Sequence, residues 1–302
     1  MSAAAIAAPA ETRTLRLRQI WSDYRRSPVA VLALVVIALL LVAAFGAPWL
    51  TPQDPYDMAA LDWADAFLPP GEVGSGEYVH WLGTDNVGRD MLSAILYGLR
   101  TSFVIGLTAN LLALAAGVVV GLSAAYFGGR LEALLMRIVD LQLSMPAILL
   151  ALVLVAVLGQ GLAQIIVALV IAQYAYFART THGAASAERR KDYIEAARST
   201  PLPTSRVLFR HLLPNVLPPL IVVASVQVAS AIALEATLSF LGVGLPLTEP
   251  SLGSLISNGF KYIHSDRHWL SIYPGVALMI AVVAINLVGD RVRHLLDPRR
   301  RR

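Results

Sequence analysis

Six long apolar segments, separated by polar stretches, dominate the pattern of the 302-residue chain. The first is a nearly unbroken run over 28–50, and the others lie at 102–127, 134–158, 162–177, 217–241 and 273–288. A helix needs about 20 apolar residues to cross the hydrocarbon core, and backbone groups inside lipid must be bonded within their own segment. The pattern therefore predicts six transmembrane helices, of which 162–177 is the shortest.

The composition agrees with this pattern. Hydrophobic residues make up 57% of the chain and charged residues 15%, whereas soluble domains average about 45–50% apolar residues. The chain has no cysteine, which excludes disulfide bonds and cysteine-based zinc sites. The expected fold class is all-α and membrane-embedded.

The distribution of lysine and arginine predicts which side of the membrane each loop occupies. Twenty of the 24 lie in the N-terminal arm, the turn after the second span, the segment after the fourth span and the tail. The other four are Arg89, Arg100, Lys261 and Arg267. Basic residues accumulate on the cytoplasmic side, so both termini are expected there. The same asymmetry accounts for the net charge of +4 without nucleic-acid binding.

Spans and loops divide the chain into five parts. They are a cytoplasmic arm (1–27), a first transmembrane helix (28–50), an extracytoplasmic loop (51–100), a core of five transmembrane helices (101–290) with a cytoplasmic loop at 182–212, and a basic cytoplasmic tail (291–302). The arm lacks the positive start and apolar centre of a signal peptide, so the first span is expected to be an uncleaved anchor.

The second half of the extracytoplasmic loop has a helical pattern. Met91, Ile95 and Leu99 recur every four residues from Asp90 onward. Such a stripe predicts a helix lying along the membrane surface. A plain helix leading into the second span is the alternative that the same periodicity allows.

Small and polar residues inside the spans indicate where helices pack and where function could lie. Ala113, Gly117, Gly121 and Ala125 recur every four residues, which favours the close approach of another helix. A carboxyl group such as Glu235 must face protein, water or a partner, so it either lines a pore or makes a structural hydrogen bond. The pore or gating candidates are Gln173, Gln227, Ser230, Glu235 and Asn286.

Motifs of catalytic and nucleotide-binding sites are missing from the sequence. Neither lysine follows a glycine, so there is no G-x-x-x-x-G-K-[ST] phosphate loop, and no H-E-x-x-H or G-x-S-x-G motif occurs. His264 and His268 lie in a polar loop, where ordinary surface residues are expected rather than a metal site. We therefore assign no catalytic residue, cofactor or metal to this chain.

One polar segment between two spans, "EAARSTPLPTSRVLFRHLLPN", resembles the EAA loop of permease subunits of bacterial ABC importers, which docks onto a separate ATPase. Glu195, Ala196 and Ala197 match its start, and Leu213, Pro214 and Asn215 match its end. Further segments resemble the same group: "HWLGTDNVGRDMLSAILYGLR", "LQLSMPAILLAL", "EATLSFLGVG" and "NLVGDRVRHLLDPR". Over 25–299 the chain resembles the DppC-like permease subunits of peptide/nickel-type importers.

This resemblance implies a type I ABC importer permease fold in the bacterial inner membrane, with a cytoplasmic coupling helix. It also implies a function as half of a translocation pore for di- or oligopeptides or related small solutes. The implied partners are a DppB-like second permease, two DppD/DppF-like ATPase subunits that bind ATP and Mg, an extracytoplasmic binding protein, and membrane lipid. Implied ATPase-coupling residues are Tyr193, Glu195, Ala196, Ala197, Arg198, Pro201 and Arg206; contacts with the binding protein are expected at Asp85, Arg89 and Asp90.

The chain departs from the EAA pattern at Pro201, which stands where the family has glycine. Proline cannot adopt the positive φ open to glycine, and it disfavours helix at the residue before it. We expect a first short helix from near Glu188 to about Thr200, a rigid corner at Pro201 and Pro203, and a second helix from near Thr204. A corner that bends differently would shift the docking surface.

Other functions stay open from the residues themselves. Residue chemistry favours ATPase docking no more than an amphipathic helix held at the headgroups by its arginines. A secondary transporter driven by an ion gradient would favour an inverted repeat and midplane charges, of which Glu235 is the strong candidate. A non-transporting membrane anchor is a third possibility. The resembled family includes importers of dipeptides, oligopeptides, nickel chelates, glutathione and some sugars, of which peptides are the default expectation.

Overall fold

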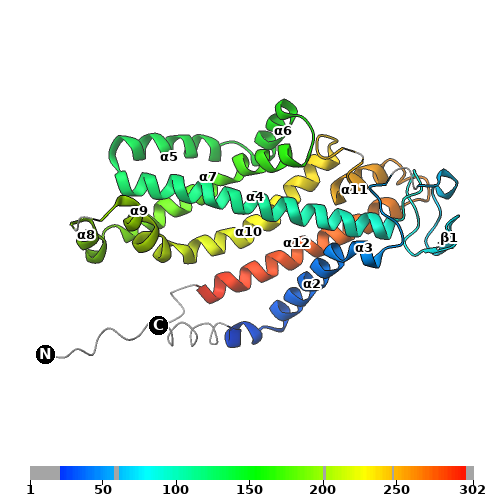
Figure 1. The fold of residues 1–302 in the computed structure, drawn as a ribbon, viewed down its shortest axis with the longest axis horizontal. Coiled ribbons are helices and arrows are strands. Elements are labelled where there is room, and N and C mark those ends of the chain that lie inside the picture. Colours follow the sequence, from blue (N-terminus) through cyan, green and yellow to red (C-terminus); the bar gives the residue numbers. More distant parts are fainter. Residues whose placement is uncertain (1–20, 58–60, 200–201, 247, 297–302) are drawn as a thin grey trace.

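The computed structural model describes residues 21–57, 61–199, 202–246 and 248–296, except for the side chains of 196–198. Most of its longer helices run roughly along the long axis of the molecule (Figure 1). These are α2 (Pro28–Phe45), α4 (Met91–Phe127), α5 (Gly129–Leu143), α7 (Leu162–Glu188), α10 (Leu213–Phe240) and α12 (Trp269–Leu296), whereas α6 (Ala147–Leu158) turns away from α5. Shorter elements are α3 (Ala47–Leu50), η2 (Trp63–Asp65), the antiparallel strands β1 (Glu72–Val73) and β2 (Val79–His80), α8 (Asp192–Ser199), α9 (Thr204–Arg206), the π-helical turn η3 (Val207–Leu212) and α11 (Leu252–Phe260).

Five helical segments in the described residues are long and apolar enough to cross a membrane. They are α2, α4, α7, the continuous stretch Thr204–Phe240, and α12. The pair α5 and α6 gives a sixth span if it is counted as one, but the two helices are bent by 94°. The predicted number of about six spans therefore agrees with the structure, while the prediction of one helix over 134–158 is wrong.

Prolines and a glycine explain where the predicted helices break. Pro146 precedes α6, and because it lacks an N–H and disfavours helix at Met145, α5 cannot continue through it. In the first span, α2 ends at Phe45 and α3 begins after Gly46, with Pro48 in its first turn. The predicted helix over 28–50 is thus two helices rather than one.

The fourth predicted span is longer than its apolar run. α7 has 27 residues, so the prediction that it is the shortest span is wrong. Its polar second half is held by partners on α5: Arg179 forms an ion pair with Asp140 at 3.1 Å, and His182 Nε2 lies 2.7 Å from Glu132 Oε1. A search for apolar residues alone ends at the first of these polar positions.

The predicted surface helix is also wrong. Met91 is the first residue of α4, which continues without a break for 37 residues. Met91, Ile95 and Leu99 are buried in a core cluster with residues of α10, α11 and α12. The alternative, a helix that leads into the second span, is the arrangement observed, so α4 begins within the loop predicted over 51–100.

The centre of the bundle is the contact between α4 and α7. A Cβ atom on Gly117 would collide with Phe177, and one on Gly121 would collide with the backbone of Ala178. Ala113 lies in the same buried stripe. The predicted stripe of small residues is therefore a helix-packing surface within this chain.

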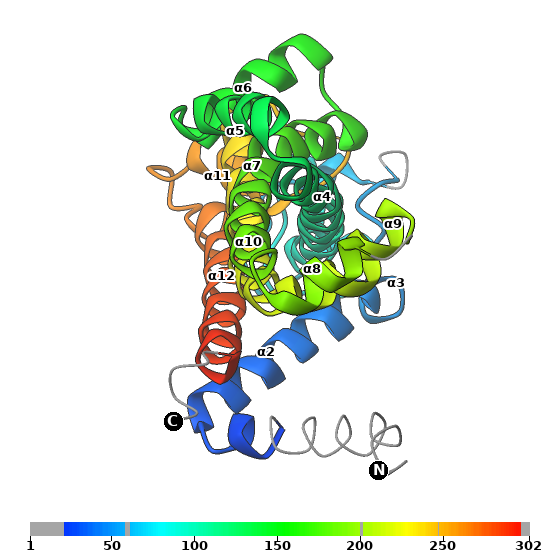
Figure 2. The same ribbon diagram turned by 90° about the vertical axis from the view of Figure 1, so that its left-hand side faces the viewer.

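The two ends of the bundle differ. Figure 2 looks onto the end where α8 and α9 lie, together with the start of α2 and the end of α12. The segment 51–90, with β1 and β2, lies at the opposite end (Figure 1). This arrangement agrees with the predicted sidedness, in which α8, α9 and the start of α2 share the cytoplasmic side.

Candidate functional site

The coupling segment, residues 189–215, joins the end of α7 to the start of α10 at one end of the bundle (Figure 2). α7 continues to Glu188 and a short break precedes α8, which begins at Asp192, so the prediction of a helix start near Glu188 is wrong. The predicted helix end near Thr200 and restart near Thr204 are confirmed: α8 ends at Ser199 and α9 begins at Thr204. Thr200 and Pro201 lie outside the described residues, so the corner stays a prediction.

An apolar anchor fixes α8 to the bundle. Ile194 is fully buried, although the residues on either side of it are exposed. It belongs to a core cluster with residues of α4, α7, η3 and α10, including Phe177, Ala185, Leu208, Leu212 and Val216. A displacement of α8 is therefore transmitted by direct packing to the helices on both sides of it.

A polar clamp supports this anchor. Tyr193 Oη donates a hydrogen bond to Glu188 Oε1 at 2.6 Å, and Asn215 Nδ2 donates to Tyr193 Oη at 2.9 Å. Lys191 Nζ pairs with Glu188 Oε2 at 2.7 Å. Tyr193 thus links the end of α7 to the start of α10. Burial and the hydrogen bond to the Glu188 carboxylate raise the pKa of Tyr193 to about 12, so the phenol stays a donor at neutral pH.

The outward face of the coupling segment carries charge. Glu195, Arg206 and Arg210 are exposed, and Phe209 is 52% exposed. An open groove of about 600 Å³ is lined by Pro203, Ser205, Arg206, Phe209, Arg210 and Pro214. The side chains of Ala196, Ala197 and Arg198 lie outside the described residues. Exposed charges around apolar side chains on a firmly seated helix make a surface suited to a protein partner.

The turn η3 beyond α9 is π-helical, with Val207, Leu208 and Leu212 buried. Such widened turns occur frequently at functional sites in helices. It follows α9 directly and leads into α10, so it connects the outer part of the coupling segment to a membrane-spanning helix.

At the opposite end, the three residues predicted to contact a binding protein are buried. Asp85, Arg89 and Asp90 are 5%, 4% and 1% exposed. Arg89 Nε donates to Asp85 Oδ2 at 2.7 Å, and Asp90 Oδ2 caps α4 by accepting from Ser93 N at 2.7 Å. Their placement does not support the predicted contact, because charges expected to be exposed in a polar loop are bonded inside it.

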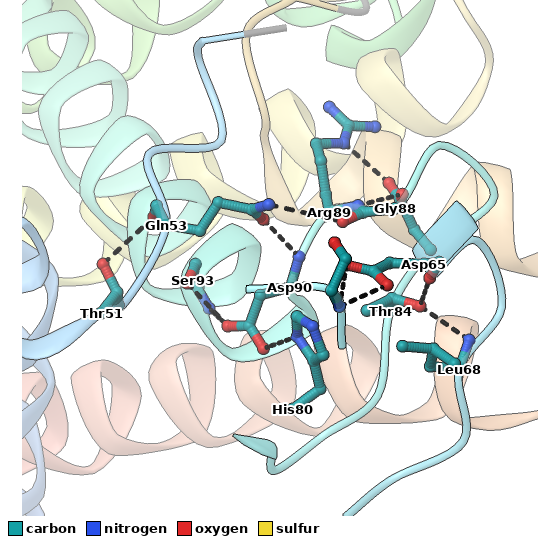
Figure 3. A network of polar contacts seen from close by, with 12 residues as sticks. Thr51, Gln53, Asp65, Leu68, His80, Thr84, Gly88, Arg89, Asp90 and Ser93 are labelled. Atoms are coloured by element: carbon teal, nitrogen blue, oxygen red, sulfur yellow. Dashed lines mark hydrogen bonds and ion pairs between the residues drawn. The ribbon is translucent and has the colours of Figure 1, made fainter. Parts of the chain in front are cut away.

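A network around Asp90 shapes this outer segment (Figure 3). His80 Nδ1 lies 3.0 Å from Asp90 Oδ1, and it donates because a carboxylate oxygen can only accept. Asp90 N donates to Gln53 Oε1 at 2.7 Å, and Thr84 Oγ1 accepts from Leu68 N at 2.7 Å. These bonds fix the described residues of the outer segment (51–57 and 61–90) to one another and to the start of α4.

Exposed tryptophans in α3 and in the outer segment were missed by sequence reasoning. Trp49 is 85% exposed, and Trp63 and Trp81 are each 70% exposed. Each directly follows a polar or turn-forming residue, Pro48, Asp62 and His80 respectively, which is a weak signal of exposure. Large exposed aromatic side chains are typical of membrane interfaces and of protein contacts.

The five pore candidates do not share one environment. Glu235 is fully buried and accepts hydrogen bonds from Ser102 and Ser239, each at 2.8 Å, which is the structural alternative foreseen for it. Gln173 and Gln227 are also buried, Ser230 is half-buried and Asn286 is exposed. The structure does not bring these five side chains to a common surface.

Comparison with known proteins gives two family matches. The family of binding-protein-dependent transport system inner membrane components matches residues 117–302. The N-terminal TM domain of oligopeptide transport permease C matches residues 16–70.

Relatives resemble the chain over nearly its whole length. The dipeptide transport system permease protein DppC of Escherichia coli is 38% identical and covers 94% of this chain and 93% of its own. The di/tripeptide permease protein DppC of Pseudomonas aeruginosa is 36% identical, covering 94% and 92%. A solved inward-facing structure of the MetNI methionine ABC transporter matches with a TM-score of 0.55 at 21% identity, covering 68% of this chain and 98% of that chain, which shows a shared fold.

Proposed function

This chain belongs to the family of binding-protein-dependent transport system inner membrane components, and on that premise we propose that it forms half of the translocation pore of an ATP-driven peptide importer. Family membership makes it a multi-pass transport subunit of the bacterial inner membrane rather than an enzyme. The observation that carries the peptide substrate is the 36–38% identity to di- and tripeptide permeases over 94% of the chain. Di- and oligopeptides are therefore the proposed substrates.

The proposed partners are a homologous second permease, two ATPase subunits that bind ATP and Mg, and an extracytoplasmic binding protein. ATPase coupling is assigned to the coupling segment, at Tyr193, Glu195, Ala196, Ala197, Arg198, Pro201 and Arg206. Support comes from the position of α8 at the end of the bundle and from the exposed charges of Glu195 and Arg206. Tyr193 contributes by holding α8 in place, because it is hydrogen-bonded to both Glu188 and Asn215.

Energy enters this chain through contact alone. When ATP closes the ATPase pair, the docked coupling segments are drawn together. Because Ile194 is buried against α7 and η3, the pull on α8 reaches both of them by direct contact rather than bending a loose loop. The bundle then changes between inward-open and outward-open forms by displacement of its packed helices.

The binding protein is proposed to dock on the outer segment, through its exposed side chains. Trp63 and Trp81 supply the large apolar area typical of strong protein contacts, and the exposed Glu72 and Glu77 supply charge around it. Asp85, Arg89 and Asp90 support this surface from beneath.

Among the predicted pore residues, Asn286 is still proposed to line the pore, because its polar side chain is exposed on a membrane-spanning helix.

Reconstitution tests the proposal. The chain is placed in vesicles with its second permease and ATPases, binding protein and ATP are added on their respective sides, and uptake of a labelled dipeptide is followed. We expect uptake to require ATP and the binding protein and to stop when the ATPases carry a catalytic substitution. Uptake by this chain without ATPases, driven by a proton or sodium gradient, would overturn the proposal.

A further inference from the structure

Three buried amide side chains inside the bundle have polar atoms without hydrogen-bond partners in the described part of the chain. Asn110 of α4, Gln173 of α7 and Gln227 of α10 are 7%, 1% and 8% exposed. The unpaired atoms are Oδ1 of Asn110, both Nε2 and Oε1 of Gln173, and Nε2 of Gln227. Unpaired amide atoms are unfavourable in an apolar interior, and lipid has no groups with which to satisfy them.

The packing of α4 against α10 brings two of these amides together. Asn110 Nδ2 donates to the carbonyl oxygen of Ala224 in α10 at 3.3 Å. Gln227 lies three residues beyond Ala224, on the same face of α10. Asn110 and Gln227 therefore flank the same contact between the two helices.

The packing of α4 against α7 places the third amide nearby. Gly117 of α4 meets Phe177 of α7, and Gly121 meets Thr181, so the two helices run in the same direction. Gln173 lies one turn before Phe177 on the same face, and Asn110 lies two turns before Gly117. Gln173 is thus displaced from the Gly117 contact toward Asn110. The helices α4, α7 and α10 lie together at the centre of the bundle in both views (Figures 1 and 2).

The unpaired atoms complement one another. Two of them are donors, Nε2 of Gln173 and Nε2 of Gln227, and two are acceptors, Oδ1 of Asn110 and Oε1 of Gln173. Gln227 can donate to Gln173, and Gln173 can donate to Asn110. These two hydrogen bonds would satisfy all four atoms, with each bond joining different helices.

We propose that Gln227, Gln173 and Asn110 form this hydrogen-bonded relay in a second conformation of the bundle, reached by a small displacement of α7 against α4 and α10. The proposal rests on the proposed function, because an alternating transporter must have two conformations. The relay favours the second conformation, and its absence here leaves the three side chains unpaired. Gln173 is accordingly a positioning residue of the transport cycle, which does not touch the substrate.

The first test compares Gln173→Leu with Gln142→Leu in the complete complex. Gln142 is the matched control, because its Nε2 already donates to the carbonyl oxygen of Ile171. We expect Gln173→Leu to leave the melting temperature of the nucleotide-free complex unchanged or raised, and to lower ATP-driven uptake at least tenfold. Gln142→Leu should lower the melting temperature. If Gln173→Leu lowers the melting temperature as much as Gln142→Leu does, the Gln173 amide is already bonded, directly or through water, and the relay is refuted. Unchanged uptake by Gln173→Leu also refutes the relay.

The second test is a double-mutant cycle of Asn110→Leu and Gln173→Leu. If the two side chains act in one relay, the double variant loses no more uptake than the more impaired single variant. If the fold-losses in uptake of the two single variants multiply in the double variant, Asn110 and Gln173 act independently and the relay is refuted. Wild-type vesicles separate the two proposals: no ATP-driven uptake by the wild type contradicts the proposed function, whereas an active wild type with an equally active Gln173→Leu contradicts the relay alone.

Discussion

Ser102 and Glu235 join α4 to α10 through a buried hydrogen bond, in which Ser102 Oγ donates to Glu235 Oε2 over 2.8 Å. Ser239 Oγ donates to the other carboxyl oxygen, also at 2.8 Å. The side chain of Glu235 is fully buried. This carboxyl group therefore fastens helices together, and it is not placed to meet a solute.

Replacing Glu235 tests this fastening role. Glu235→Ala leaves two buried serine hydroxyls without their acceptor, so we expect a loss of about 1–3 kcal/mol in stability. Glu235→Gln keeps an acceptor oxygen and should lose about half as much or less. Thermal unfolding of the purified complex measures both. Glu72→Ala, at an exposed position, is the control and should change stability by no more than about 0.5 kcal/mol. Equal stability of Glu235→Ala and wild type would contradict the role.

Much of the bundle could be predicted because apolar runs long enough to span lipid have few alternatives to helix. The predictions fail where a single residue breaks a helix, or where a residue far away in the sequence determines the environment of a side chain. Pro146 lies at the 94° bend in the third span, and α7 continues beyond its apolar run with Arg179 paired to Asp140 of α5. The sequence shows that Glu235 is unusual in a span, but the serine that binds it from another helix, Ser102, lies 133 residues earlier. No local pattern connects the two.

The approach of α4 to α7 gives a second prediction. In Gly117→Ala the added Cβ collides with Phe177, so the helices must separate. We expect destabilisation of about 1–3 kcal/mol or more, seen as a lower melting temperature or lower membrane yield. Gly275→Ala in α12 is the matched control, since nothing lies within 4 Å of its added Cβ. Alanine there should be neutral or stabilising by up to about 1 kcal/mol. A tolerated Gly117→Ala would show that the helices are not in close contact.

The network at Asp90 gives a third prediction, for the outer segment. Asp90→Ala removes the cap of α4 and the partner of His80, which together should destabilise the segment by about 2–4 kcal/mol. We expect faster protease cleavage within 51–90 and weaker stimulation by the binding protein. Asp90→Asn keeps an N-cap and should be milder. Asp62→Ala, which removes an exposed cap from the short η2, is the control. Cleavage no faster than in this control would contradict the bracing role.

The break between α8 and α9 was predictable because proline restricts the backbone: α8 ends at Ser199, and α9 begins at Thr204 directly after Pro203. The start of α8 was not predicted correctly. The anchoring of α8 to the bundle was not predictable from the sequence. Ile194 stands among polar neighbours, and its burial depends on Phe177 and Leu212 from other elements. Likewise, Tyr193 finds Asn215 22 residues later in the chain. These contacts exist only once the bundle has formed.

The sidedness of the chain is a fourth prediction, and the absence of cysteine makes it direct to test. Ser75 and Ser199 are both exposed, at opposite ends of the bundle. A membrane-impermeant thiol reagent applied outside intact spheroplasts should label Ser75→Cys and leave Ser199→Cys unlabelled. Permeabilised cells are the control, in which both react. Labelling of Ser199→Cys alone in intact spheroplasts would reverse the orientation.

The clamp at Tyr193 gives a fifth prediction. Because the folded-state pKa is raised to about 12, the stability from the neutral phenol is fully present below about pH 10 and is lost as the pH rises through 12. Titration of this group should therefore not alter uptake between about pH 6 and 9. Tyr193→Phe removes both hydrogen bonds, and we expect it to lower uptake per ATP hydrolysed at every pH in this range. A pH-dependent loss in the wild type that Tyr193→Phe abolishes would contradict this.

The anchor at Ile194 separates docking from transmission. Ile194→Ala leaves the exposed face of α8 intact but removes packing beneath it, at a typical loss of about 2–5 kcal/mol for a buried isoleucine. We expect the ATPases to copurify and to hydrolyse ATP, while uptake falls at least tenfold. Glu195→Arg, on the exposed face, should instead weaken copurification. Ile263→Ala, on the outer side and 36% exposed, is the matched control for loss of the same atoms. If Ile194→Ala transports as well as this control, α8 passes motion to the bundle by some other contact than its buried side.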